Sequence, residues 1–318
     1  MRGLLEVDQV GDGWCPVEEI EDRHGLVARD DDAKVNHPRL PYSRMLTDYH
    51  VHLRPDDPDA TPQEYFTNDN VDRYLDAAGA GGIDELGVSE HIHRFTEALE
   101  IWDHPFWQTS AVDDLGAYCE FVSGTQLRLG IEMDFVVGRE DRIASVLDRH
   151  GWDYVIGSVH FVGDGAVDFH IFDAWEGGPD PDRLWRRYFE TLAEAARSGL
   201  YDILAHPDLI KYWGEQRPLP ARDLRFHYEP AIEAIAESGV AVEISTAGLR
   251  KPIGELYPAD AFVEMCIDAG AAFSLSSDAH VPEHIGYEYE PTVERMRGWG
   301  IEEVAVFEGR ERRMEALG

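Results

Sequence analysis

The sequence is poor in cysteine and lysine and has no long apolar run. Its three cysteines, Cys15, Cys119 and Cys266, are far apart and odd in number, so they predict no disulfide framework and favour a reducing cytoplasm. No apolar run approaches the ~18 residues that a membrane-spanning helix needs. The N-terminal residues turn acidic too early for a secretory signal. A disulfide-rich secreted domain and a membrane protein are therefore not expected.

Basic residues are scarce relative to acidic ones. The chain has 28 Lys and Arg against 63 Asp and Glu, a net charge of −35. Such a field repels nucleic acid polymers and anionic membranes, so neither is an expected partner. A small molecule remains as the expected binding partner. The composition does not predict the oligomeric state.

Two regions differ in their pattern. Residues 1–40 are acidic and lack hydrophobic periodicity, which predicts an N-terminal extension, whereas residues 41–318 alternate between strand and helix patterns. Strands are predicted at 46–53, 83–89, 127–132, 152–159, 201–205, 240–244, 272–276 and 303–307. Helices are predicted at 62–80, 113–123, 139–149, 181–198, 226–238, 258–269 and 290–299.

This repeated alternation predicts an α/β fold of seven or eight βα units. A closed parallel barrel fits better than an open doubly wound sheet, because no G-x-G-x-x-G follows a strand. Polar residues also stand at the end of one predicted strand after another. In a barrel, the carboxyl ends of the strands converge on a single site.

Histidines and carboxylates occupy these strand ends. His50 and His52 lie two residues apart on an extended strand, so their side chains share one face. Nitrogen and carboxylate ligands without a thiolate suit Zn, Fe or Mn rather than a cysteine-rich structural zinc site. The set is large enough for two or three divalent ions, with Glu132 placed to bridge two of them. The candidate metal ligands are His50, His52, His91, Glu132, His160, His206, Asp278 and His280.

The motifs that contain these residues resemble the PHP superfamily, and in particular its histidinol-phosphatase branch. The resemblance covers roughly residues 45 to 285, in the family's order. The motifs are Asp48-Tyr49-His50-Val51-His52, Ser89-Glu90-His91, Gly130-Ile131-Glu132, Gly157-Ser158-Val159-His160, Ala205-His206-Pro207-Asp208-Leu209, Ala247-Gly248-Leu249-Arg250-Lys251 and Ser277-Asp278-Ala279-His280.

The resemblance implies a distorted (β/α)7, TIM-like PHP barrel with a dinuclear or trinuclear metal centre. The implied ligand sets are His50, His52, Glu132 and Asp278 for one ion, Glu132, His160 and His206 for a second, and His91 and His280 for a third.

The loop after His52 departs from the family pattern. A further histidine normally completes the third ligand set, but residues 54–62 contain none. Asp56, Asp57 or Asp59 is the expected substitute, and otherwise the third site is weak or absent.

The implied activity is that of a metal-dependent phosphomonoester hydrolase, a histidinol-phosphate phosphatase of histidine biosynthesis that uses a metal-bridging hydroxide. Asp278 and Glu132 are the candidate catalytic residues, and Asp278 could also accept or pass a proton. Two alternatives stay open: a PHP phosphoesterase acting on a small nucleotide or sugar phosphate, and a catalytically inactive metal-binding regulatory module. The substrate phosphate needs cations, and the candidates near the strand ends are Lys211, Arg250, Lys251 and Arg54.

Overall fold

The computed structural model describes residues 44–57 and 60–318. The predicted extension at residues 1–40 lies outside the described residues, as do Cys15 and Asp59. Cys119 and Cys266 are buried and carry free thiols.

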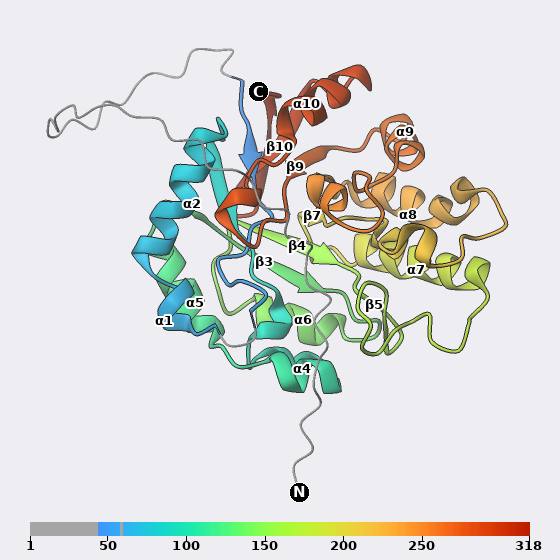
Figure 1. Ribbon diagram of the computed structural model, residues 1–318, viewed down its shortest axis with the longest axis horizontal. Coiled ribbons are helices and arrows are strands. Elements are labelled where there is room, and N and C mark those ends of the chain that lie inside the picture. Colours follow the sequence, from blue (N-terminus) through green and yellow to red (C-terminus); the bar gives the residue numbers. More distant parts are fainter. Residues whose placement is uncertain (1–43, 58–59) are drawn as a thin grey trace, which may run out of the picture. The chain divides into compact units, whose positions relative to one another are not determined.

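Seven parallel strands form a nearly closed barrel (Figure 1), which confirms the predicted (β/α)7 architecture. The barrel closes between its first and last strands, where Val51 forms a parallel bridge with Ala279. The backbone N–H of His52 donates to the carbonyl of Ala279 at 2.8 Å. In their order around the sheet the strands are β1 (Thr47–Asp48), β2 (Glu85–Val88), β3 (Arg128–Asp134), β4 (Tyr154–Ser158), β7 (Ile203–Leu204), β8 (Ala241–Ser245) and β9 (Phe273–Ser276).

Helices flank the sheet, with α2 and α5 along one side and α7, α8 and α9 along the other (Figure 1). The α-helices are α1 (Pro62–Tyr65), α2 (Asn68–Ala80), α3 (Ala98–Ile101), α4 (Pro105–Ser110), α5 (Leu115–Ser123), α6 (Glu140–Leu147), α7 (Pro181–Arg197), α8 (Leu224–Ser238), α9 (Asp260–Asp268) and α10 (Tyr289–Gly298). Short 3-10 turns occur at η1 (Ile92–Arg94), η2 (Leu209–Lys211), η3 (Gly214–Gln216), η4 (Thr246–Arg250) and η5 (Pro282–His284).

The ends of these helices follow from local sequence. Helix α7 begins with Pro181 after Asp180, whose side chain accepts a hydrogen bond from the N–H of Asp182. Helix α8 ends at Gly239, whose φ of 69° is a left-handed conformation that glycine adopts without steric cost. The predicted helix at 62–80 is interrupted, because Thr67 leaves the helical conformation and caps α2 by accepting from the N–H of Asn70.

The last predicted strand, at 303–307, forms but is not a strand of the barrel. It is β10 (Glu303–Glu308), which pairs antiparallel with β11 (Glu311–Ala316). Only Gly309 and Arg310 connect the two strands, and both have positive φ, as a tight hairpin turn requires. A second hairpin, β5 (Phe161–Val162) with β6 (Gly165–Ala166), follows the fourth barrel strand and was not predicted.

Tyr154 packs across the strands below the first histidine motif. A Cβ atom on Gly87 or Gly130 would overlap its ring, so both positions leave room for it. The Tyr154 hydroxyl donates to the carbonyl of Tyr49 at 2.6 Å, and the two rings lie 4.8 Å apart. The Tyr49 ring also contacts Phe307 of β10. This packing holds the backbone of β1 immediately before His50.

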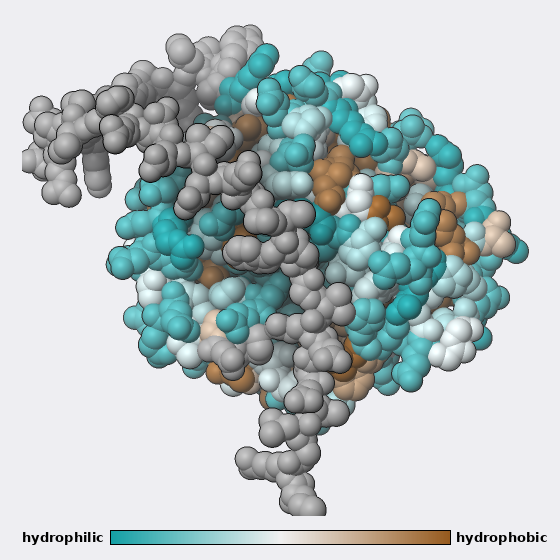
Figure 2. Space-filling view, viewed as in Figure 1, coloured by the Kyte–Doolittle hydropathy of each residue, from teal (hydrophilic) through white to brown (hydrophobic). Residues whose placement is uncertain are grey.

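The one face seen in the space-filling view is largely polar (Figure 2). Apolar residues occur on this face in small separate patches (Figure 2). No helix within residues 44–57 and 60–318 is long and apolar enough to cross a membrane.

Candidate metal centre

The eight predicted ligands come together at one end of the barrel, although they are spread over some 230 residues of sequence. Seven of them lie two to four residues after the end of a strand, and the eighth lies within β3. His50 and His52 follow β1, His91 follows β2, Glu132 belongs to β3, His160 follows β4, His206 follows β7, and Asp278 and His280 follow β9.

Glu132 is the centre of the cluster, and its two carboxylate oxygens face different histidines. Its Oε1 lies 3.2 Å from Nε2 of His206 and 3.4 Å from Nε2 of His160. Its Oε2 lies 3.4 Å from Nε2 of His50 and 3.7 Å from Nε2 of His52. One carboxylate therefore contacts the two groups of ligands that were predicted to share it.

Three-residue groups with ligand atoms within 4.8 Å of one another form around it. His52 Nε2 lies 3.3 Å from Asp278 Oδ1, and these two residues group with His50. The groups adjoining Glu132 pair it with His50 and His206, and with His91 and His160. His91 thus contacts Glu132 and also groups with His52 and His280, and the division of the ligands among ions stays a prediction.

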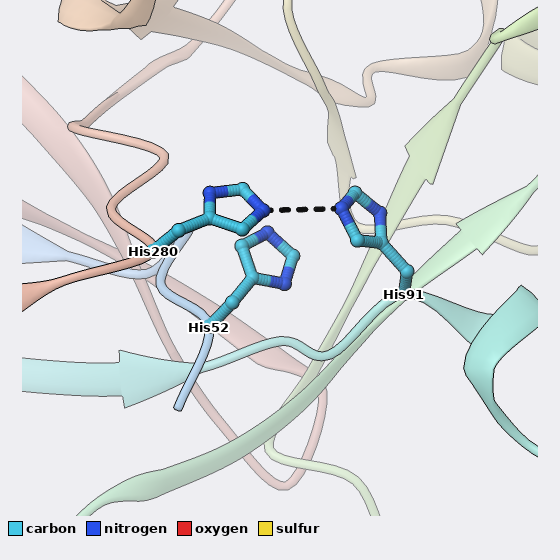
Figure 3. Close-up of side chains that lie close together, drawn as sticks. All are labelled: His52, His91 and His280. Carbon is cyan, nitrogen blue, oxygen red and sulfur yellow. Dashed lines mark hydrogen bonds between the residues drawn. The ribbon is translucent and has the colours of Figure 1, made fainter. Parts of the chain in front are cut away.

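The outer group consists of His52, His91 and His280 (Figure 3). Nε2 of His91 and Nε2 of His280 point toward each other at 3.4 Å. Asp56, from the loop that lacks the family's histidine, places Oδ1 3.4 Å from Nε2 of His280. The same oxygen accepts a hydrogen bond from Arg94 at 2.8 Å. Asp56 is therefore the candidate substitute that the structure brings to this group.

The atoms of the cluster fit divalent cations. His50 Nε2, both ring nitrogens of His52, Glu132 Oε2 and Asp278 Oδ1 are buried without a hydrogen-bond partner among the described residues. Buried polar atoms without a partner are costly, and metal coordination removes that cost. Imidazole nitrogens and carboxylate oxygens without sulfur suit Zn, Fe or Mn.

Two carboxylates behind the histidines fix their orientation. Glu243 on β8 lies 2.8 Å from Nδ1 of His50, and Asp134 on β3 lies 2.7 Å from Nδ1 of His160. With Nδ1 of each ring bound in this way, Nε2 is directed at Glu132. Glu243 also accepts from the hydroxyl of Ser276 and from the backbone N–H of His206.

Sequence analysis did not single out Glu243 or Asp134. A signal existed for Glu243, because it is the one carboxylate within the apolar run 240–244. Asp134 comes two residues after Glu132 and so shares its face of the strand. Glu90, in the motif before His91, was not singled out either. It accepts from the backbone N–H groups of Leu53 and Arg54 and so holds the loop after His52.

Two ligands have left-handed backbone conformations. Asp278 has φ of 51° and His206 has φ of 23°, which are uncommon for residues other than glycine. Arg250 supports the first of these turns by donating to the carbonyls of Ser277 and Asp278 at 2.8 and 3.0 Å. Strained conformations of this kind cluster at functional sites.

The charges of the centre are mutually dependent. Burial raises the pKa of Glu132, but the imidazoles of His91, His50 and His160 outweigh it and hold that pKa well below its usual range. Burial likewise raises the pKa of Asp278, but His50 and His52 outweigh burial and hold that pKa well below its usual range. Both carboxylates are therefore ionised and able to bind cations near neutral pH.

A cavity of about 200 Å³ opens beside the cluster. Of the four predicted phosphate-binding residues, only Lys251 is among its described lining residues. The lining residues are Asp56, His91, His93, His160, Phe161, Asp168, Phe169, His206, Leu209, Tyr212, Lys251, Tyr257, Asp278 and His280.

The other three cations are engaged elsewhere. The Lys211 ammonium is buried, lies 3.0 Å from Asp208 and donates to the carbonyl of Leu256. Arg54 pairs with Asp113 at 2.8 Å, and Arg250 holds the turn at Asp278. Their role in binding phosphate stays a prediction.

Comparisons with known proteins agree with the geometry. The family model described as "PHP domain" matches residues 64–247. A protein of Deinococcus radiodurans named "Probable histidinol-phosphatase" is 34% identical over 71% of this chain and 86% of its own length. A Bacillus subtilis protein named "Histidinol-phosphatase" is 26% identical over 72% of this chain and 94% of its own length.

A solved structure shares the fold. The histidinol phosphate phosphatase of Lactococcus lactis, complexed with zinc, L-histidinol and phosphate, superposes with a TM-score of 0.66. It is 20% identical in sequence, and the match covers 85% of this chain and all of that one.

Proposed function

The chain belongs to the PHP domain family, and from this premise we propose that it is a metal-dependent histidinol-phosphatase. It is a phosphoric monoester hydrolase that converts histidinol phosphate and water to histidinol and phosphate, a step of histidine biosynthesis. The observation that carries the proposal is the convergence of six histidines and two carboxylates, five of which line a cavity that Lys251 also lines.

The residues of the chain have distinct tasks in this reaction. The eight clustered side chains would hold two or three divalent ions, which supply Lewis acidity toward water and the phosphoryl oxygens. Lys251 faces the same cavity and would bind a phosphoryl oxygen as a point charge.

Asp278 is placed to move a proton. It lines the cavity, it is ionised, and its Oδ1 is buried without a hydrogen-bond partner among the described residues. Its carboxylate would accept a proton from the attacking water or pass one to the leaving alkoxide. The cytoplasmic location and the identity of the ions, Zn, Fe or Mn, stay predictions.

Substrate preference and metal content together test the proposal. We expect purified protein to contain divalent ions and to release phosphate from histidinol phosphate with a higher kcat/KM than from a nucleoside monophosphate or 4-nitrophenyl phosphate. His52→Asn should lower both metal content and activity. His150→Asn is the matched control, because His150 lies outside the cluster, against Trp152.

Two results would contradict the proposal. A higher kcat/KM for the nucleoside monophosphate would indicate a different phosphoesterase. A metal-loaded protein that hydrolyses none of the three esters would indicate a metal-binding module without catalysis.

A further inference from the structure

Two carboxylates that line the cavity, Asp56 and Asp168, belong to none of the metal-type groups, and Asp56 is already paired with Arg94. Asp168 follows the hairpin β5–β6 and lines the cavity together with Lys251, Phe169 and Tyr212. Its Oδ1 is buried and has no hydrogen-bond partner among residues 44–57 and 60–318. None of the metal-type groups found among the described residues includes Asp168. The protein thus bears the cost of a desolvated carboxylate oxygen facing its substrate cavity.

A neighbouring aspartate shows what a structural role looks like in this loop. Asp173 accepts from the backbone N–H of Trp175 at 2.9 Å and pairs with Arg217. The first interaction ties the loop to itself, and the second ties it to the residue after η3. Oδ1 of Asp168 has no equivalent partner among the described residues, so the described loop contacts do not account for this oxygen.

The cavity has charges of opposite sign for the two ends of a substrate. Lys251 supplies the cation that a phosphate requires. Asp168 supplies a carboxylate, the group that best accepts hydrogen bonds from an ammonium or imidazolium. The rings of Phe169, Tyr212 and Tyr257 line the space as well and offer flat surfaces to an aromatic ring.

We infer that Asp168 binds the cationic end of the substrate and thereby makes the enzyme selective for phosphomonoesters that carry an ammonium or imidazolium group. The inference rests on the proposed function and adds a specificity-determining residue to it. The bound cation satisfies Asp168 Oδ1, whereas a phosphomonoester without a cationic group leaves this oxygen buried and unpaired. Discrimination by an unpaired buried group is the kind that rejects the wrong substrate strongly.

Product inhibition separates the two ends of the substrate. In the metal-loaded enzyme, L-histidinol probes the cationic end and inorganic phosphate probes the other. Asp168→Asn keeps the shape and removes the charge, and we expect it to raise the inhibition constant of L-histidinol about tenfold or more, since charged hydrogen bonds are worth this much. The inhibition constant of phosphate should change by a much smaller factor.

The substrate ratio gives a second readout. The ratio of kcat/KM for histidinol phosphate to kcat/KM for 4-nitrophenyl phosphate should fall by a similar factor in Asp168→Asn. Asp164→Asn is the matched control, because it removes the same charge four residues earlier from an exposed hairpin position that does not line this cavity. Its ratio should match the wild type.

The possible failures are distinguishable. If the wild type hydrolyses histidinol phosphate selectively and Asp168→Asn keeps that selectivity, the inference is overturned and the proposed function stands. If Asp168→Asn weakens L-histidinol and phosphate equally, or loses metal ions, Asp168 belongs to the metal centre and the inference is overturned. If the wild type does not prefer histidinol phosphate, the proposed function fails first and the inference fails with it.

Discussion

The metal centre has an inner side and an outer side that differ in burial. The inner side is Glu132 with His50, His160 and His206. The outer side is the group of His52, His91 and His280 together with Asp56, and within it only His52 is fully buried. The side chains of His50 and Glu132 are 0% exposed, whereas that of His280 is 16% exposed and that of Asp56 is 68% exposed.

The two sides also differ in what orients them. On the inner side, Glu243 and Asp134 fix the rings of His50 and His160. On the outer side, Nδ1 of His280 has a backbone carbonyl at 3.4 Å, and Asp56 shares its oxygen with Arg94. Orienting partners raise the metal affinity of a histidine ligand. We therefore expect the inner side to hold a divalent ion more tightly than the outer side would.

The largest effect is expected from Glu132→Gln. Both oxygens of Glu132 face histidines, so the loss of its charge should release the inner ions. Loss of a residue that only orients a metal ligand costs up to roughly 100-fold in activity. Loss of Glu132 should therefore lower kcat/KM by more than roughly 100-fold. Metal analysis and phosphate release measure the two losses. The control is Glu140→Gln, which changes the first residue of α6. Retention of both metal and activity would remove Glu132 from the centre.

A smaller effect is expected from Glu243→Gln. Glu243 is not a predicted metal ligand but orients one, His50. Metal affinity on the inner side should fall roughly 10- to 100-fold. Excess metal should restore activity, which a misfolded protein would not show. Glu237→Gln is the control, because Glu237 pairs with Arg197 at the surface. Activity that stays low at saturating metal would contradict a role confined to orienting His50.

The smallest effect is expected from Asp56→Asn, which tests the outer side. Metal content should fall by no more than one ion per chain, and the remaining ions should resist a chelator as they do in the wild type. Asp69→Asn, at an exposed position in the first turn of α2, is the control. Equal loss of all ions would show that the two sides are not distinct, and full retention would exclude Asp56 as a ligand.

Much of the fold could be predicted because the signals are local. Most barrel strands lie in short, largely apolar runs that precede a polar residue, and the long helices have clear start and stop residues, such as Asp180 and Gly239. The convergence of the ligands then follows from barrel geometry alone. The role of each ligand stays a prediction.

The rest depended on tertiary contacts that the sequence does not display. The strand at 303–307 has the pattern of a barrel strand, and only pairing with β11 places it outside the barrel. Lys211 and Arg250 follow strand ends as phosphate-binding residues would, but their donors are engaged by Leu256 and Asp278. In the sequence, Glu243 is only one residue of a predicted strand. Its contact with His50 exists only in the folded protein.

The packing of Tyr154 against two glycines has a consequence for how this protein can evolve. Gly87 and Gly130 lie on different strands, yet any side chain at either position meets the same ring. The three positions are therefore constrained as a unit. In a saturation library, alanine at Gly130 should be tolerated only together with a smaller residue at 154, whereas Tyr154→Phe should not rescue it, because ring carbons are among the atoms that clash. If the two substitutions are tolerated only together, the library would show from sequence alone that Tyr154 and these glycines pack together next to the first histidine motif.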